Sequence, residues 1–153
     1  MENKQAGNKR LVGKLLIAGL ILFVIAAATA WYLFTETYGD TATEKEAYTV
    51  NALELIKEFK QNDSVANRKY AEKIVTVNGR ISSIDAADTT LNVRIDDATG
   101  SYVIFAFQQQ DFERVKKLQQ GDSVSIKGSC SGGAYSDILE TEFITFKRCS
   151  LNK

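Results

Sequence analysis

The stretch from Leu15 to Phe34 contains twenty residues without a charge, LLIAGLILFVIAAATAWYLF. At about 1.5 Å rise per residue, a helix of this length measures about 30 Å, which is the thickness of a bilayer core. Trp31 and Tyr32 near its end are typical of the aromatic residues that lie at membrane interfaces. We therefore expect one transmembrane helix over residues 15–34, followed by a polar tether over residues 35–46.

The charges on either side of this segment indicate its orientation. Residues 1–14 carry four basic residues against one acidic residue, a balance of +3, and the whole chain balances 19 basic against 19 acidic residues, so the remainder carries −3. Basic flanks stay in the cytoplasm. We expect a single-pass signal anchor in a bacterial-type cytoplasmic (inner) membrane, with residues 1–14 inside and residues 47–153 outside.

A cleaved signal peptide is the alternative reading of the same segment. Ala28, Thr29 and Ala30 resemble a cleavage site that follows an apolar run, with the cut after Ala30. The apolar run continues to Phe34, however, and is longer than the roughly 7 to 15 residues of a typical signal core. The length of the run favours the anchor.

The rest of the composition excludes several kinds of chemistry. The chain has no histidine and only two cysteines, Cys130 and Cys149. Triads that need a histidine base are therefore excluded, and a zinc site with four thiolate ligands cannot form. We expect no enzymatic activity, no catalytic residues, no metal and no cofactor.

The periodicity of the apolar residues after the tether predicts a small barrel. Val50, Leu53, Ile56 and Phe59 recur at three-residue steps, which indicates an amphipathic helix that begins near Ala47. After a second short helix over residues 65–70, the period changes to two. The predicted elements are three strands over residues 75–82, 91–96 and 102–107, a helix from an N-capping Asp111 to Leu118, a strand over residues 124–128, a glycine-rich connection over residues 131–142, and a fifth strand over residues 143–151.

This order of elements is that of an OB fold, a five-stranded, partly open Greek-key barrel. The predicted fold class is therefore all-β or α+β, with an amphipathic helix before the barrel and a helix between the third and fourth strands. Gly79 and Gly128 fall where strands of a small barrel bend sharply. A mixed α+β sandwich is the second choice.

The details resemble the bacterial tRNA_anti-like group of OB-fold domains. The resemblance covers roughly residues 47–151, and its motifs are glycines and alternating apolar positions. It is carried by Asn62, Ala66, Tyr70, Lys73, Val75, Val77 and Gly79 in the first half, and by Leu118, Gly121, Asp122, Val124, Ile126, Gly128, Cys130 and Cys149 in the second. The resemblance implies the fold and an exported or membrane-attached protein, and it implies no catalytic residue.

Three basic residues are candidates for binding an anion. Arg80, Arg94 and Lys127 point outward from the first, second and fourth predicted strands, which are neighbours in an OB barrel. Together they could meet a phosphate or the carboxylate of a polysaccharide. The alternative is an ordinary solvated face.

Two tyrosines are candidates for stacking. Tyr102 lies on the third strand, on the opposite side from Phe105 and Phe107, which we assign to the core. Tyr135 lies in the last connection, among the loops that line the usual OB cleft.

Cys130 and Cys149 are a candidate disulfide, because an oxidising compartment favours bonding between two cysteines. In a simple hairpin of the fourth and fifth strands the two residues would lie at opposite ends, beyond the ~7 Å limit between Cα atoms. A curled connection could bring them together, so the bonded and the free state both stay open.

We interpret the chain as a membrane-anchored binding module whose partner outside the cytoplasm is a protein or an envelope polymer. The alternative is a membrane-tethered protein that binds oligonucleotides. Because phosphate contacts need an excess of lysine and arginine, the balance of −3 argues against the alternative.

Overall fold

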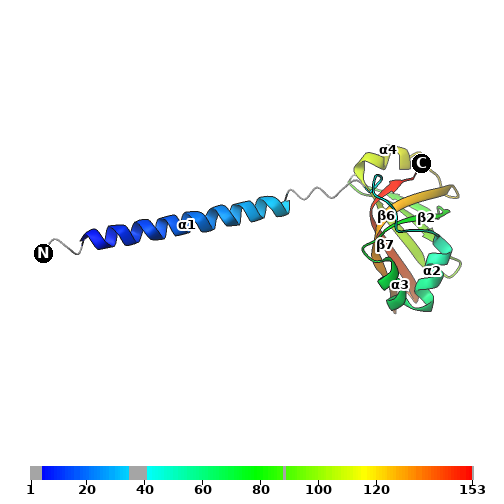
Figure 1. The fold of residues 1–153 in the computed structure, drawn as a ribbon. Coiled ribbons are helices and arrows are strands. Elements are labelled where there is room, and N and C mark those ends of the chain that lie inside the picture. The colour runs from blue at the N-terminus through cyan, green and yellow to red at the C-terminus, as the bar shows by residue number, and fades with distance from the viewer. Residues whose placement is uncertain (1–4, 35–40, 88, 153) are drawn as a thin grey trace. The chain divides into compact units, whose positions relative to one another are not determined.

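The structure is a computed structural model that describes residues 5–34, 41–87 and 89–152. The chain divides into two compact units, Met1–Tyr38 and Gly39–Lys153. The first unit contains one helix and the second contains the whole sheet (Figure 1). The two units are described separately below.

The helix of the first unit, α1, runs over Gln5–Phe34 and includes the uncharged stretch that begins at Leu15. The predicted membrane span is not confirmed, since none of the helices within the described residues meets the length and hydropathy that crossing a bilayer requires. The first half of the predicted tether, residues 35–40, lies outside the described residues, as do residues 1–4 of the predicted cytoplasmic N-terminus.

The second unit begins with an element that the sequence did not predict. Tyr48–Asn51 forms a strand, β1, which pairs in parallel with the strand that starts at Ile74. The predicted helix therefore starts later, as α2 (Ala52–Gln61), where the side chain of Asn51 accepts a hydrogen bond from the N–H of Leu53. The helix α3 (Asp63–Tyr70) follows and begins with the same kind of cap at Asn62. Of the predicted apolar face, Ile56 and Phe59 are buried in the core, whereas Leu53 is 53% exposed and Val50 lies in β1. The buried face of α2 consists of Ala52, Leu55, Ile56 and Phe59.

The sheet has the connectivity of an OB barrel. Its strand order is β1-β2-β6-β7-β5-β4-β3, with β5 and β7 parallel and β1 and β2 parallel. The bounds are β2 (Ile74–Arg80), β3 (Ser83–Ala86), β4 (Leu91–Asp96), β5 (Tyr102–Phe107), β6 (Ser123–Ser136) and β7 (Thr141–Leu151).

Two strands near opposite ends of this order, β2 and β3, are successive halves of one bent strand. The N–H of Ile81 donates to the carbonyl of Asp122, just before β6, whereas the N–H of Ser82 donates to the carbonyl of Arg94 on β4. The backbone thus changes partner between two adjacent residues, and this change closes the sheet into a barrel. The expected five strands are seven in the structure, because β1 is added and because β3 forms directly after the end of the first predicted strand at Ser82.

The predicted connection over residues 131–142 is wrong. β6 continues to Ser136 and β7 begins at Thr141, so most of this segment is paired strand. A bulge between Cys130 and Gly132 interrupts the pairing, and Gly132 has a positive φ of 97°. Gly133 passes so close to the core that a Cβ there would lie 2.8 Å from the ring of Phe59. These glycines allow β6 to pass close to the helices α2 and α3. A glycine-rich segment therefore suggested a loop where the structure has a strand.

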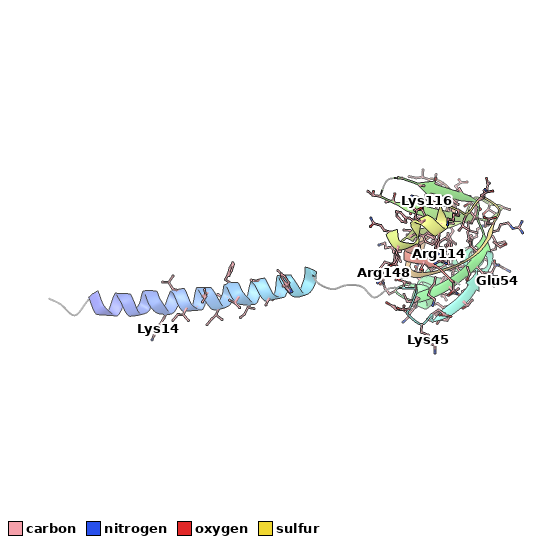
Figure 2. The ribbon with its side chains drawn as sticks, turned by 90° about the horizontal axis from the view of Figure 1, so that it is seen from above. Lys14, Lys45, Glu54, Arg114, Lys116 and Arg148 are labelled. Carbon is pink, nitrogen blue, oxygen red and sulfur yellow. The ribbon has the colours of Figure 1, made fainter. Side chains whose placement is uncertain are left out.

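Between β5 and β6 the predicted helix is shorter than expected. A 3-10 turn over Gln109–Asp111 leads into α4 (Phe112–Val115), and Asp111 makes no side-chain cap. Its buried carboxylate instead accepts a hydrogen bond from Arg114 at 2.9 Å. Figure 2 shows the side chains of Arg114 in α4 and of Lys116 directly after it.

The two glycines predicted at sharp bends are required by close packing. A Cβ on Gly79 would lie 2.8 Å from Ile95 and 3.0 Å from Ala52, and a Cβ on Gly128 would lie 2.7 Å from the sulfur of Cys149. Real Cβ atoms do not come so near other groups, so larger residues would push α2 or β7 away from the barrel. The space around these positions explains the need for glycine, and a sharp bend of the strands there stays a prediction.

Candidate nucleic-acid interface

Three side chains form a stack on the outer face of β4, β5 and β7. The guanidinium carbon of Arg94 lies 4.1 Å from the ring centroid of Tyr102, and the Tyr102 ring stacks with that of Phe143 at 6.4 Å between centroids and 27° between planes. All three are partly exposed. We call Arg94, Tyr102 and Phe143 the stacking platform.

The same strands carry a second aromatic pair on their inner face. Phe105 of β5 and Phe146 of β7 are fully buried, with ring centroids 5.2 Å apart. Successive residues of a strand point to opposite sides, so the core already receives its aromatic residues from these inward positions. The rings of the stacking platform therefore lie where the packing of the barrel does not require them.

A carboxylate fixes the cation of the platform. Asp96 accepts hydrogen bonds from Nε and Nη2 of Arg94 at 2.6 and 2.9 Å. The backbone N–H of Asp96 donates to the hydroxyl of Ser82 at 2.8 Å, at the point where the bent strand joins β4. This two-fold contact holds the guanidinium over the ring of Tyr102, and a cation over the face of an aromatic ring is a favourable arrangement.

The platform continues into a shallow groove on the outer side of β6 and β7. Phe143 lines both, and beyond it the groove of about 310 Å³ is bordered by Thr145 and the exposed Lys147. On its other side lie residues 131–134 and Asn67, whose amide is hydrogen-bonded to the backbone of Gly133. A chain that lies across the platform would thus meet a cation at the far end of the groove.

Two of the predicted site residues, Arg94 and Tyr102, are brought together by the structure. Phe143 was missed as a site residue, because the sequence marks it only as the start of a strand. Its place beside Tyr102 follows from the parallel pairing of β5 with β7, in which the two residues are register partners. The alternation of apolar residues does not reveal which distant strands are neighbours.

The proposed cluster of three cations is not formed. Lys127 is only 8% exposed, and its ammonium group lies 3.0 Å from the carboxylate of Glu46 and donates to the carbonyl of Glu44. The segment before β1, which the sequence assigned to the tether, covers it. Arg80 lies outside the stacking platform, in a pocket that it shares with Asp96.

Tyr135 is exposed, as predicted, but does not join the platform. It is the register partner of Glu142 on β7, one position away from Phe143. Opposite residues in an antiparallel pair share a face and successive residues alternate. Tyr135 therefore lies on the other face of the β6–β7 hairpin.

Both cysteines are free and buried. Cys149 lies beside Gly128, two residues from Cys130 along β6, so the two are not at opposite ends of the hairpin as expected. Burial raises the pKa of Cys130 to about 11 and raises that of Cys149 well above its ordinary value. Among the described residues there is also no group of three or more carboxylate or thiol side chains that could hold a metal ion.

The sequence matches the family described as tRNA_anti-like over residues 4–141. The chain belongs to the tRNA_anti-like family. This match covers most of the chain, and the expected family is thereby confirmed. No curated protein matches this tRNA_anti-like chain.

Several solved structures are similar to part of this tRNA_anti-like protein. One is a protein from Klebsiella pneumoniae subsp. pneumoniae, provisionally named as a nucleic acid-binding lipoprotein, with 20% identity, a TM-score of 0.53, and coverage of 68% of this chain and 91% of that one. A replication factor A related protein from Methanobacterium thermoautotrophicum has 17% identity, a TM-score of 0.38, and coverage of 53% and 82%. An asparaginyl-tRNA synthetase from Pyrococcus horikoshii has 19% identity, a TM-score of 0.37, and coverage of 54% and only 20%.

The buried thiols predict slow alkylation of the native protein. Because the thiolate is the reactive form and the pKa of Cys130 is raised to about 11, iodoacetamide at pH 8 should label both cysteines far more slowly in the folded protein than in urea. A raised thiol pKa stabilises the fold below the ordinary pKa of 9.0, and this contribution is lost as the pH rises toward 11.

Mass spectrometry after timed labelling measures the rate. Two fast-reacting thiols in urea without reductant agree with the free state. Labelling in urea that requires a reductant would mean that Cys130 and Cys149 are bonded, contrary to this structure.

Proposed function

We propose that this protein binds single-stranded nucleic acid through the stacking platform. The observation that carries the proposal is the solvent-facing stack of Arg94, Tyr102 and Phe143, on strands whose core aromatics face the other way. Unpaired bases stack on aromatic rings and on guanidinium planes, at about 1–3 kcal/mol per base. No reaction is part of the proposal, since the platform offers binding groups only.

The charges around the platform favour binding that depends on stacking more than on phosphate contacts. The groups that can meet phosphates are Arg94 at one end and Lys147 at the other, and Asp96 compensates the charge of Arg94. Neutralising about two phosphates on a single strand, these two platform cations alone contribute about −1.4 to the slope of log K against log salt. A mildly acidic domain and a stacking interface are therefore compatible.

The family supports the proposal at the level of fold. The Klebsiella protein with the same fold carries a provisional name as a nucleic acid-binding lipoprotein. At 20% identity that name transfers no residue, and the platform of the present chain supports the proposal independently.

A protein partner is the second candidate function, and the tip of the β6–β7 hairpin favours it. Ile138 is 93% exposed and Leu139 is 62% exposed, next to Tyr135 at 52%. Exposed apolar residues that adjoin one another often mark a contact surface. An envelope polymer has less support, because the three cations expected to bind its carboxylates are not together.

We propose in addition that residues 15–34 anchor the protein in the inner membrane, with the barrel outside. The support is the uncharged sequence together with the exposure of apolar side chains such as Leu16, Phe23 and Trp31, at 69, 72 and 74%. A helix that is apolar on all sides needs an apolar environment. The basic residues of the N-terminus support the orientation.

Binding of oligonucleotides tests the first proposal. The full-length protein in a non-ionic detergent should bind a fluorescent 12-nucleotide single strand, and Tyr102→Ala should weaken binding about tenfold through the loss of one stacked base. Tyr135→Ala, on the other face of the hairpin, is the matched control and should change affinity less than twofold. Fluorescence anisotropy measures both, and a wild-type protein that binds no single strand would refute the proposal.

Extraction of cell membranes with alkaline carbonate tests the anchor. The wild-type protein should stay in the membrane pellet, whereas Leu22→Arg combined with Ile25→Arg should shift it to the supernatant, because a charge at the bilayer centre costs about 2.5–3.5 kcal/mol per residue. The matched control is Leu22→Ile with Ile25→Leu. Release of the wild-type protein by carbonate would contradict the anchor, and protection of the barrel from protease added to spheroplasts would contradict the orientation.

A further inference from the structure

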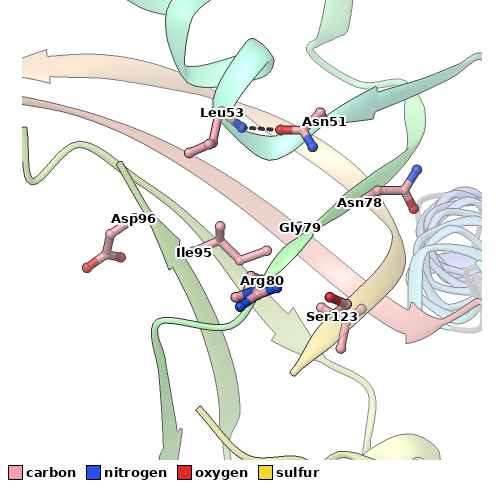
Figure 3. Close-up of a pocket in the computed structure, with 9 residues that line it drawn as sticks. Asn51, Leu53, Asn78, Gly79, Arg80, Ile95, Asp96 and Ser123 are labelled. Carbon is pink, nitrogen blue, oxygen red and sulfur yellow. Dashed lines mark hydrogen bonds between the residues drawn. The ribbon is translucent and has the colours of Figure 1, made fainter. Parts of the chain in front are cut away.

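A second cavity lies beside the stacking platform, where the bent strand passes the start of α2. It has a volume of about 410 Å³, within the range of ligand pockets in proteins. Its polar lining comes from Asn51 of β1, Asn78 and Arg80 of β2, Ser123 of β6 and Asp96 of β4, and its apolar lining from Leu53, Gly79, Ile95 and Val124. Figure 3 shows Asn51 and Leu53 on one side of the cavity, with Arg80 between Asp96 and Asn78.

The polar groups of this pocket are grouped by the register of the sheet. Asn51 of β1 is the partner of Asn78 on β2, and Ser123 of β6 is the partner of Arg80. Two amides, a hydroxyl and one guanidinium therefore belong to the lining of the same pocket. The oxygen of Asn51 accepts a hydrogen bond from Leu53, which leaves its N–H groups directed to other partners.

Arg80 and Asn78 are available for a ligand. Both are exposed, and neither side chain makes a hydrogen bond or ion pair within the described part of the chain. The carboxylate of Asp96, by contrast, is already engaged with both Nε and Nη2 of Arg94. The unpaired charge of the pocket is thus positive.

Asp96 joins the pocket to the stacking platform. Its side chain lines the pocket and holds Arg94, and it is the register partner of Tyr102. A nucleic-acid strand that leaves the platform at Arg94 can therefore pass Asp96 to reach the pocket that Arg80 lines.

We propose that this pocket holds one unstacked nucleotide of the strand bound on the platform, with Asn78 at the edge of the base and Arg80 at its phosphate. The proposal rests on the proposed function. The amide of an asparagine offers a donor and an acceptor side by side, which matches the N6 and N7 atoms of adenine. The exposed side chain of Leu53 provides an apolar wall for the face of the base. The pocket therefore gives the protein a preference for adenine at one position.

Binding of oligo-dA and oligo-dT by the full-length protein in detergent tests the pocket. Asn78→Ala should weaken the binding of oligo-dA about tenfold and that of oligo-dT less than twofold, because a two-point contact to the correct base is worth about 1–3 kcal/mol. Arg80→Ala should weaken both equally and reduce the salt slope by about 0.7, the loss of one phosphate contact on a single strand. Gln61 of α2 and Arg68 of α3 are exposed and do not line the pocket. Gln61→Ala and Arg68→Ala are therefore the matched controls and should bind like the wild type.

The outcomes separate the pocket from the platform. If Tyr102→Ala loses affinity while Asn78→Ala and Arg80→Ala bind both oligonucleotides like the wild type, the pocket proposal is overturned and the proposed function stands. If the wild type binds neither oligonucleotide, both fall. Asn78→Asp keeps the shape of the side chain and replaces its hydrogen-bond donor by an acceptor, so it should also lose the preference for oligo-dA. This variant tests the pocket if Asn78→Ala does not fold.

Discussion

The barrel depends on one change of hydrogen-bonding partner. Between Ile81 and Ser82 the backbone leaves the β6 side and joins β4, so that one bent strand connects the two ends of the sheet. The bend closes the sheet into a barrel, and β1 is an added strand beside β2. The bend also places Gly79 against Ile95 and Ala52, where no Cβ fits, and brings Ser82 to the backbone of Asp96. The bend thus determines the position of the carboxylate that holds Arg94.

Closure divides each strand into an inner and an outer set of side chains. The inner set of β5 and β7 includes Phe105 and Phe146 and fills the core. The outer set of the same strands includes Tyr102 and Phe143, which the core does not need. Aromatic residues on the outside of a small barrel lower the solubility of the protein. A role in binding explains why Tyr102 and Phe143 lie there. The stack with Arg94 connects this outer set to β4.

Much of the barrel was predictable from the sequence, because alternation along a strand is a local property. The burial of Val75 and Val77 and the outward direction of Tyr102 both follow from it. The partners across the sheet do not, which is why Phe143 was missed and why Lys127 was expected at a free surface. Gly132 and Gly133 suggested a loop, since composition cannot distinguish a flexible glycine from one that a helix approaches closely.

Photocrosslinking tests the central claim, that single strands lie on the outer face of β4, β5 and β7. The full-length protein would be bound to an oligonucleotide that carries 5-iododeoxyuridine, irradiated, digested and mapped by mass spectrometry. We expect crosslinks in the peptides that contain Tyr102 and Phe143, because their rings stack on the bases. Crosslinks confined to α4 or to the tip of the β6–β7 hairpin would contradict this placement.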